Sequence, residues 1–222
     1  MRSSPTQRFR LIVFDLDGTL IDSRRDIAES ANELLTECGA QPLPETQVGR
    51  MVGDGAAKLI ARAFTASGIE RPPDALARFL AIYERRLTDC TRPYPGILDV
   101  LEVLAARATL ALLTNKPARP TMTILERLAL APFFPASLVI GGDGPFPRKP
   151  DPAGLVDLVR QAGVEKQAAV LVGDSVIDHR TARAAGTSVC VARYGFGFED
   201  FPRDSLEIGD LFVDSPAGLL AL

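Results

Sequence analysis

Short apolar segments that recur along the chain constrain its fold more than any other feature. The first contains LIVF, which is apolar at every position, and is ended at about residue 16 by the turn signal Asp-Gly. Segments that are apolar throughout are typical of strands buried on both faces. Similar segments lie at residues 109–115, 137–142 and 168–175, and a fifth begins at Thr187. Stretches with helical spacing separate them, so we expect an α/β core: a doubly wound, Rossmann-like parallel sheet with helices on both faces.

The chain between the first and second apolar segments is far longer than one crossover helix requires. Apolar residues recur there with helical spacing, and turn-rich breaks at residues 41–46 and 69–74 divide the stretch. We therefore expect an inserted α-helical cap domain at residues 22–93, and a core made of residues 1–21 and 94–222.

The composition is that of an ordinary globular protein, and 222 residues suffice for one domain or for one domain with a smaller insertion. Its 25 basic and 28 acidic residues among 222 leave a net charge of −3, which gives no support to a nucleic-acid partner. The N-terminal MRSSPTQRFR lacks the apolar stretch of a signal peptide, and no apolar run approaches the roughly 20 residues that span a bilayer. Cys38, Cys90 and Cys190 are far apart and odd in number, so we expect small core residues rather than disulfides or a metal site. A cytoplasmic enzyme without a membrane partner is the expectation.

Polar and charged side chains that could bind a ligand or take part in catalysis follow each of the first four predicted strands. In chain order they are Asp15 and Asp17; Thr114, Asn115 and Lys116; Lys149; and Asp174, with Asp178 one helical turn further on. Parallel strands bring their carboxyl ends to one edge of a sheet, so these groups should converge. Several carboxylates around one point require a hard cation, most naturally Mg²⁺, and a lysine with a hydroxyl suits an anionic group such as phosphate.

Each of these residues also has a simpler interpretation when it is taken alone. Asp174 could cap a helix, and Lys149 could be a surface lysine in a proline-rich loop. His179, the only histidine, is expected to be an exposed helix residue. The Asp-Leu-Asp-Gly-Thr segment after an apolar strand is the most specific signal. Because all the motifs occur in order, each at its own strand end, together they favour a functional site.

With these motifs in place, the chain resembles the haloacid dehalogenase superfamily of phosphohydrolases that carry a helical cap. Within it, the chain is most similar to the phosphoglycolate phosphatase group, because MVGDGAA at residues 51–57 is similar to the VGxG segment of that group's cap. The resemblance implies a hydrolase in which Asp15 is the nucleophile that forms an aspartyl-phosphate. It implies that Asp17 is the general acid and base for the leaving oxygen and the attacking water.

The resemblance also implies the roles of the other motif residues. Mg²⁺ would be held by Asp15, by the main-chain carbonyl of Asp17 and by Asp174, while Asp178 would orient metal-bound waters or Lys149. Thr114 and Lys149 would hold the transferring phosphoryl oxygens, with backbone N–H groups near Asp17 and Asn115 as further donors.

The substrate is expected to be a small phosphorylated metabolite, with phosphoglycolate as the model. Gly53 would let the cap backbone approach it closely. A carboxylate on the substrate would need a cation, for which Lys58 and Arg50, beside the glycine segment, and Lys116, beside the phosphate site, are the candidates.

The sequence leaves two alternative functions, the physiological ester and the oligomeric state open. A sugar phosphomutase of the same superfamily would share Asp15, Asp17 and a similar cap, whereas a dehalogenase would lack the acid that Asp17 supplies. A non-catalytic phosphate-binding or phospho-aspartate module is the alternative from a different class. The physiological ester is not identified, and the protein could be a monomer or a homodimer.

Overall fold

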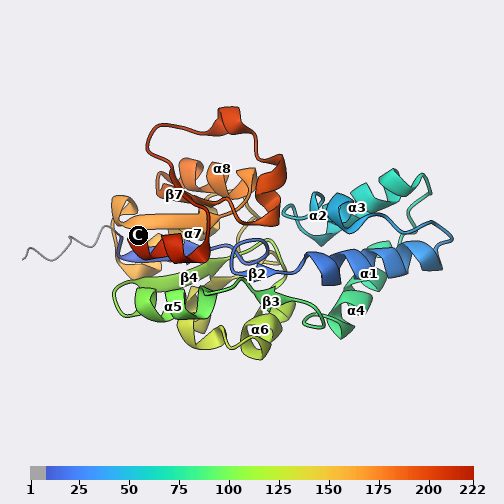
Figure 1. The fold of residues 1–222 in the computed structure, drawn as a ribbon, viewed down its shortest axis with the longest axis horizontal. Helices are drawn as coiled ribbons and strands as arrows, with labels where there is room; N and C mark the ends of the chain where they lie inside the picture. Colours follow the sequence, from blue (N-terminus) through green and yellow to red (C-terminus); the bar gives the residue numbers. More distant parts are fainter. Residues whose placement is uncertain (1–8) are drawn as a thin grey trace, which may run out of the picture.

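The computed structural model describes residues 9–222, with a parallel sheet beside a group of helices (Figure 1). The sheet has six strands in the order β5-β4-β1-β6-β7-β8, and every neighbouring pair is parallel. Residues 1–8, which carry most of the segment judged not to be a signal peptide, lie outside the described residues. The strands are β1 (Leu11–Phe14), β4 (Thr109–Leu113), β5 (Val139–Ile140), β6 (Ala169–Gly173), β7 (Ser188–Ala192) and β8 (Leu211–Val213).

Strand β1 lies at the centre of the sheet and is buried on both faces. Leu11 pairs with Thr109 of β4 on one side and with Ala169 of β6 on the other. Because side chains alternate along a strand, Ile12 packs into one hydrophobic cluster and Val13 into the other. This two-sided burial explains why the sequence segment is apolar at every position, and it confirms the predicted α/β fold.

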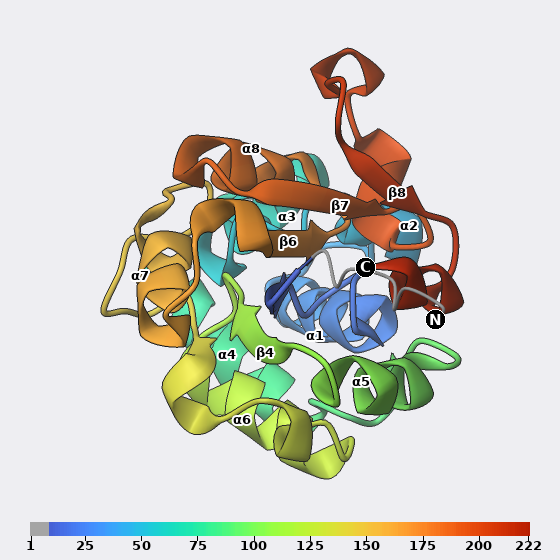
Figure 2. The same ribbon diagram turned by 90° about the vertical axis from the view of Figure 1, so that its left-hand side faces the viewer.

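Helices cover both faces of the sheet (Figure 2). Helices α5 (Ile97–Ala105) and α6 (Ala118–Arg127) contribute to the cluster that holds Ile12. Helices α7 (Ala153–Ala162) and α8 (Val176–Ala185) contribute to the cluster on the opposite face. Short 3₁₀ helices complete the described chain, at Ala131–Phe133, Ala136–Leu138, Lys166–Ala168, Phe196–Asp200, Arg203–Ser205 and Pro216–Ala221.

Four helices of the inserted segment lie together at one side of the sheet (Figure 1). They are α1 (Arg24–Glu37), α2 (Glu45–Gly49), α3 (Ala56–Ser67) and α4 (Ala75–Arg85). Their breaks include the two turn-rich segments found in the sequence, and a further break carries Gly53 and Gly55 between α2 and α3. The helical character expected here is present, and the domain boundaries at residues 22–93 stay a prediction. None of the helices described is long and apolar enough to cross a membrane.

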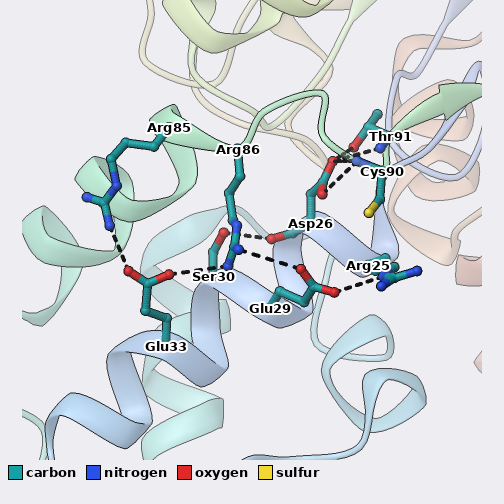
Figure 3. Close-up of polar contacts among 9 residues, drawn as sticks. All are labelled: Arg25, Asp26, Glu29, Ser30, Glu33, Arg85, Arg86, Cys90 and Thr91. Atoms are coloured by element: carbon teal, nitrogen blue, oxygen red, sulfur yellow. Dashed lines mark hydrogen bonds and ion pairs between the residues drawn. The ribbon is translucent and has the colours of Figure 1, made fainter.

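The inserted helices leave and rejoin the core through two strands that pair with each other. These are β2 (Ile21–Asp22) and β3 (Arg92–Pro93), which are antiparallel. In the first turn of α1, the carboxylate of Asp26 accepts hydrogen bonds from the backbone N–H of Cys90 at 3.0 Å and of Thr91 at 2.7 Å (Figure 3). The Thr91 hydroxyl donates a further bond of 2.6 Å.

Asp26 is fully buried, so the hydrogen bonds from these three donors replace the water that its carboxylate loses. We call Asp26, Cys90 and Thr91 the hinge clasp. Beside it, Arg86 lies between Glu29 and Glu33 of α1, at 3.7 and 3.2 Å (Figure 3). The clasp holds the outgoing and returning chain together at a single junction.

Candidate active site

The acids predicted to converge do so around Lys149. Asp15 directly follows β1, Asp178 lies in the first turn of α8, and Lys149 comes from the loop after β5; all three are buried. The Lys149 ammonium is 2.8 Å from Asp15 Oδ1 and 2.6 Å from Asp178 Oδ1. The lysine therefore bridges acids from two different strand ends and holds the Asp15 carboxylate in place.

Asp178 is fixed by the start of its own helix. Ser175 is the N-cap of α8, and its side chain and that of Asp178 form a capping box. The Ser175 hydroxyl donates to Asp178 Oδ2 at 2.6 Å, which leaves Oδ1 to accept from Lys149. The structure thus places Asp178 against Lys149, and its role in orienting Lys149 or metal-bound waters stays a prediction.

Asp174 follows β6 and is surrounded by glycines. Its Oδ2 accepts a hydrogen bond of 2.7 Å from the backbone N–H of Gly197. A Cβ added at Gly18 or Gly195 would overlap the Asp174 side chain, so only glycine fits at either position. The contact with Gly197 was not foreseen, because nothing local in the sequence brings residues 195–197 to this strand end.

Burial dominates the electrostatics of the acids. It raises the pKa of Asp15 to about 7; attraction to Lys149 opposes this rise, and repulsion from Asp178 and Asp17 adds to it. Burial, followed by repulsion from Asp178 and Asp15, raises the pKa of Asp174 well above its usual range. Burial acts to lower the pKa of Lys149, but Asp15 and Asp178 together raise it.

The donor set fits a divalent cation. Asp15, Asp174 and Asp178 each offer a carboxylate oxygen, and these oxygens lie within 4.8 Å of one another. Lys149 contacts two of the three acids, so the cluster holds more negative charge than this lysine can balance. Buried, oxygen-only and acidic sites of this kind suit Mg²⁺.

Asp17 points into the same region and is held at one oxygen. The Ser23 hydroxyl donates to Asp17 Oδ1 at 2.6 Å, and the Lys116 ammonium lies 3.1 Å from the same atom. Ser23 was not singled out from the sequence, although it closes the LIDS stretch that follows the first motif. Its position immediately before α1 links Asp17 to the junction with the helices.

Thr114 and Asn115 extend from the end of β4, and both are buried. The Thr114 hydroxyl accepts a hydrogen bond of 3.2 Å from the backbone N–H of Lys116. The Asn115 side-chain amide donates to the carbonyls of Gly53 at 2.8 Å and of Lys149 at 2.9 Å. Asn115 thus ties the inserted segment and the Lys149 loop to the sheet, which the sequence did not suggest.

These residues open onto a pocket between the sheet edge and the inserted helices. Its polar lining contains Asp15, Asp17, Thr114, Asn115, Lys116, Asp174 and Ser175. Apolar side chains from α1, α3 and α4 line the other part: Ile27, Leu59, Phe79 and Leu80, together with Tyr83. Gly53 lines the pocket with φ of +117°, a conformation that favours glycine.

Two of the three cations predicted to contact the substrate, Lys58 and Arg50, do not line this pocket, and their role stays an untested prediction. The Lys58 side chain is 65% exposed and pairs with Asp54 at 3.0 Å, one helical turn earlier. The Arg50 side chain is 57% exposed and lies 3.5 Å from Asp200. The structure therefore brings only Lys116, of the three, to the pocket.

His179 is buried rather than exposed, contrary to the expectation. Its Nε2 lies 2.9 Å from Asp210 Oδ2, and its ring meets the edge of Phe201 at 5.9 Å between centroids. These contacts hold the loop before β8 against α8. Cys190 is a core residue as predicted, whereas Cys38 and Cys90 are half-buried; all three are free thiols.

Buried acids and a lysine at the ends of parallel strands, beside a helical insertion, define an α/β enzyme. A family model described as haloacid dehalogenase-like hydrolase matches residues 12–192. The chain belongs to this family, which confirms the resemblance seen in the sequence.

The relatives agree with this assignment. The chain is 45% identical over 199 residues to a phosphoglycolate phosphatase of Rhodospirillum rubrum, covering 86% of this chain and 82% of the relative. It is 37% identical over 220 residues to a phosphoglycolate phosphatase of Caulobacter vibrioides, covering 95% and 91%.

Solved structures have the same fold. A predicted phosphoglycolate phosphatase from Haemophilus somnus superposes with a TM-score of 0.90 at 31% identity, covering 98% of this chain and 99% of its own. A candidate beta-phosphoglucomutase from Thermotoga maritima superposes with a TM-score of 0.74 at 24% identity, covering 96% and 97%, and shows the fold alone.

Proposed function

We propose that this protein is a Mg²⁺-dependent phosphomonoester hydrolase that acts on small phosphorylated metabolites such as phosphoglycolate. The observation that most supports this proposal is the buried Asp15 carboxylate at a strand end. It lies 2.8 Å from the Lys149 ammonium and belongs to the acidic cluster. The relatives named phosphoglycolate phosphatase support the choice of substrate.

In the proposed reaction, a carboxylate oxygen of Asp15 attacks the phosphorus atom, and the bond from phosphorus to the ester oxygen breaks. The product of this step is an aspartyl-phosphate. Water then attacks the same phosphorus, which releases inorganic phosphate and restores Asp15. Two displacements replace one difficult hydrolysis, and each requires an oxygen fixed in line with the bond that breaks.

Asp17 is the proposed proton carrier for both steps. It gives a proton to the departing ester oxygen and later takes one from the attacking water. Ser23 and Lys116 both contact Oδ1 of Asp17. Within residues 9–222 no contact is described for Oδ2, so the arrangement leaves that oxygen to meet the substrate.

The remaining motif residues neutralise and orient charge. Asp15, the main-chain carbonyl of Asp17 and Asp174 would hold Mg²⁺, which when bound would stabilise the negative charge of the transferring phosphoryl group. Lys149 and the Thr114 hydroxyl would contact phosphoryl oxygens. Asp178 acts through Lys149, whose ammonium it holds at 2.6 Å.

The inserted helices would act as a cap that excludes water from the pocket during the first transfer. The hydrogen bond from Asn115 to the Gly53 carbonyl supports this role, because it joins the helical segment to the phosphate end of the site. A cytoplasmic location, a monomeric or homodimeric state and the lack of nucleic-acid or membrane partners stay predictions. The net charge of −3 supports the lack of a nucleic-acid partner.

Phosphate release from phosphoglycolate by purified protein, with Mg²⁺ and with EDTA, tests the proposal. We expect Asp15→Asn to lower turnover by at least about 10³-fold, because an amide cannot be the nucleophile. Asp214→Asn, at an acid whose side chain is 74% exposed, is the matched control and should keep wild-type turnover.

Rapid acid quench with labelled substrate should trap phosphate on wild-type protein and not on the Asp15→Asn variant. An active Asp15→Asn variant would rule out the covalent route, and turnover that EDTA leaves unchanged would remove the metal. Transfer of the label to a sugar phosphate instead of water would identify a mutase.

A further inference from the structure

One buried cation lies in the pocket wall, among acidic, neutral polar and apolar side chains. Lys116 follows Thr114 and Asn115 at the end of β4 and is 8% exposed. Its ammonium donates to the hydroxyl of Tyr83 at 2.6 Å and lies 3.1 Å from Asp17 Oδ1. Of the described residues that line the pocket, Lys116 is the only lysine or arginine. Because Tyr83 belongs to α4, this contact joins the core to the cap.

Two hydrogen-bond donors remain unused at this contact. An ammonium group has three N–H donors, and Tyr83 and Asp17 engage two of those on Lys116. The Tyr83 oxygen accepts from Lys116, and its own O–H has no acceptor among residues 9–222. A positive charge with two adjacent free donors is the arrangement that binds a carboxylate well.

The surroundings make this place selective for an anion. Phe79 stacks on Tyr83 with 5.8 Å between ring centroids, and Leu80 and Pro120 also line the pocket. Burial acts to lower the pKa of Lys116, but Asp17 and Tyr83 raise it, so the lysine stays charged. In such a poorly hydrated environment an unpaired anion would be unfavourable, and one that meets Lys116 is stabilised.

The position of Lys116 also limits how far the anion can lie from the phosphate. The same lysine contacts Asp17, which gives a proton to the departing ester oxygen in the proposed reaction. A group bound by Lys116 must therefore lie close to that oxygen. In phosphoglycolate, the carboxylate is attached to the very carbon that bears the ester oxygen.

We propose that Lys116 and Tyr83 form the carboxylate subsite of this enzyme. Its substrates are small phosphate esters with a carboxylate on the carbon that carries the ester oxygen. This proposal rests on the proposed phosphatase function for the phosphate end of the site. Since Lys116 comes from the core and Tyr83 from the cap, the subsite is complete only when the cap is seated on the core.

The test compares phosphoglycolate with ethyl phosphate, which lacks the carboxylate. We expect Lys116→Met to lower kcat/KM for phosphoglycolate about ten- to a hundredfold more than for ethyl phosphate. Tyr83→Phe should lower kcat/KM for phosphoglycolate about three- to tenfold more than for ethyl phosphate. The ratio of the two substrates is the readout, because Lys116 also contacts Asp17. Lys166→Met, at an exposed lysine, is the matched control and should change neither substrate.

Binding supplies a readout that does not need turnover. Phosphoglycolate is titrated calorimetrically into Asp15→Asn protein and into the Asp15→Asn, Lys116→Met double variant. The double variant should bind phosphoglycolate about ten- to a hundredfold more weakly. Tyr83→Phe removes one oxygen atom only, so it keeps the test valid if Lys116→Met fails to fold.

Each result separates the two proposals. A wild-type protein that does not prefer phosphoglycolate, or variants that keep the wild-type preference and affinity, would overturn the subsite and leave the phosphatase intact. Failure to hydrolyse either ester would overturn the proposed function, and the binding measurement would still decide on the subsite.

Discussion

The buried Asp15 carboxyl predicts that the metal-free protein loses stability as the pH rises. Burial is the main reason that its folded-state pKa is about 7, against 3.8 for the ordinary side chain. Between these values the folded protein holds a proton that the unfolded chain has released. The free energy of unfolding therefore falls as the pH rises through this window. Asp174, whose pKa is shifted in the same direction, adds to the fall.

The size of the effect follows from the shift of Asp15. At about 1.4 kcal/mol per pH unit, the difference between 3.8 and about 7 amounts to about 4 kcal/mol, of which about 2–3 kcal/mol falls between pH 5 and pH 8. Acids with lowered pKas, such as Asp54 and Asp157, act in the opposite sense, but their contribution is complete above about pH 5.

Urea unfolding in EDTA at pH 5 and pH 8 measures this difference, with Asp15→Asn as the control. The amide cannot ionise, so the variant should lose less stability over this range and should be more stable than wild type at pH 8. Mg²⁺ should restore wild-type stability at pH 8, because it binds the ionised acids of the folded state. If wild type and variant changed equally between pH 5 and pH 8, Asp15 would not be the buried acid described here.

Two further predictions concern packing. Asp26→Asn should destabilise the protein by about 1–3 kcal/mol in urea, because three donors converge on the carboxylate and the amide nitrogen of asparagine cannot accept a hydrogen bond. An unchanged midpoint would show that the hinge clasp contributes little. Gly195→Ala should destabilise by about 1–3 kcal/mol and weaken stabilisation by Mg²⁺, because the added Cβ overlaps Asp174 and the Gly18 carbonyl. Wild-type Mg²⁺ affinity in that variant would contradict a close fit around Asp174.

Local sequence patterns were sufficient to predict the core of the fold and the convergence of acids from separate strand ends, whereas the roles of those residues stay predictions. Strand β1 is apolar because it is buried on both faces, and Asp15 is recognisable because it follows such a strand. Strand β8 could not be found in this way: it has three residues, and its Phe212 is 37% exposed. A short edge strand with one solvent-facing side lacks the continuous apolar run used to find the others.

Contacts between cap and core could not be predicted, because they depend on how two separate segments dock. In the sequence, Tyr83 belongs to the same apolar stripe as the other buried residues of its helix. Only the structure shows that its hydroxyl lies 2.6 Å from the Lys116 ammonium. Lys58 was favoured because it lies near the glycine segment. Because Lys58 follows Asp54 by four residues, its side chain instead pairs with that acid and extends into solvent.

The pairing of β2 with β3 also determines how the inserted helices affect the stability of the core. Because β2 and β3 pair as adjacent antiparallel strands, the chain leaves and re-enters the core at one point. Residues 23–91 therefore connect β2 and β3 as the loop of a β-hairpin connects its two strands. The entropy of closing a loop rises only slowly with its length, so the core tolerates a large insertion here at little cost in stability. A helical unit of another size could be joined at this junction without opening the sheet, provided that its own two ends meet there. It would have to replace the contacts that Ser23 and Gly53 make with Asp17 and Asn115 at the strand ends.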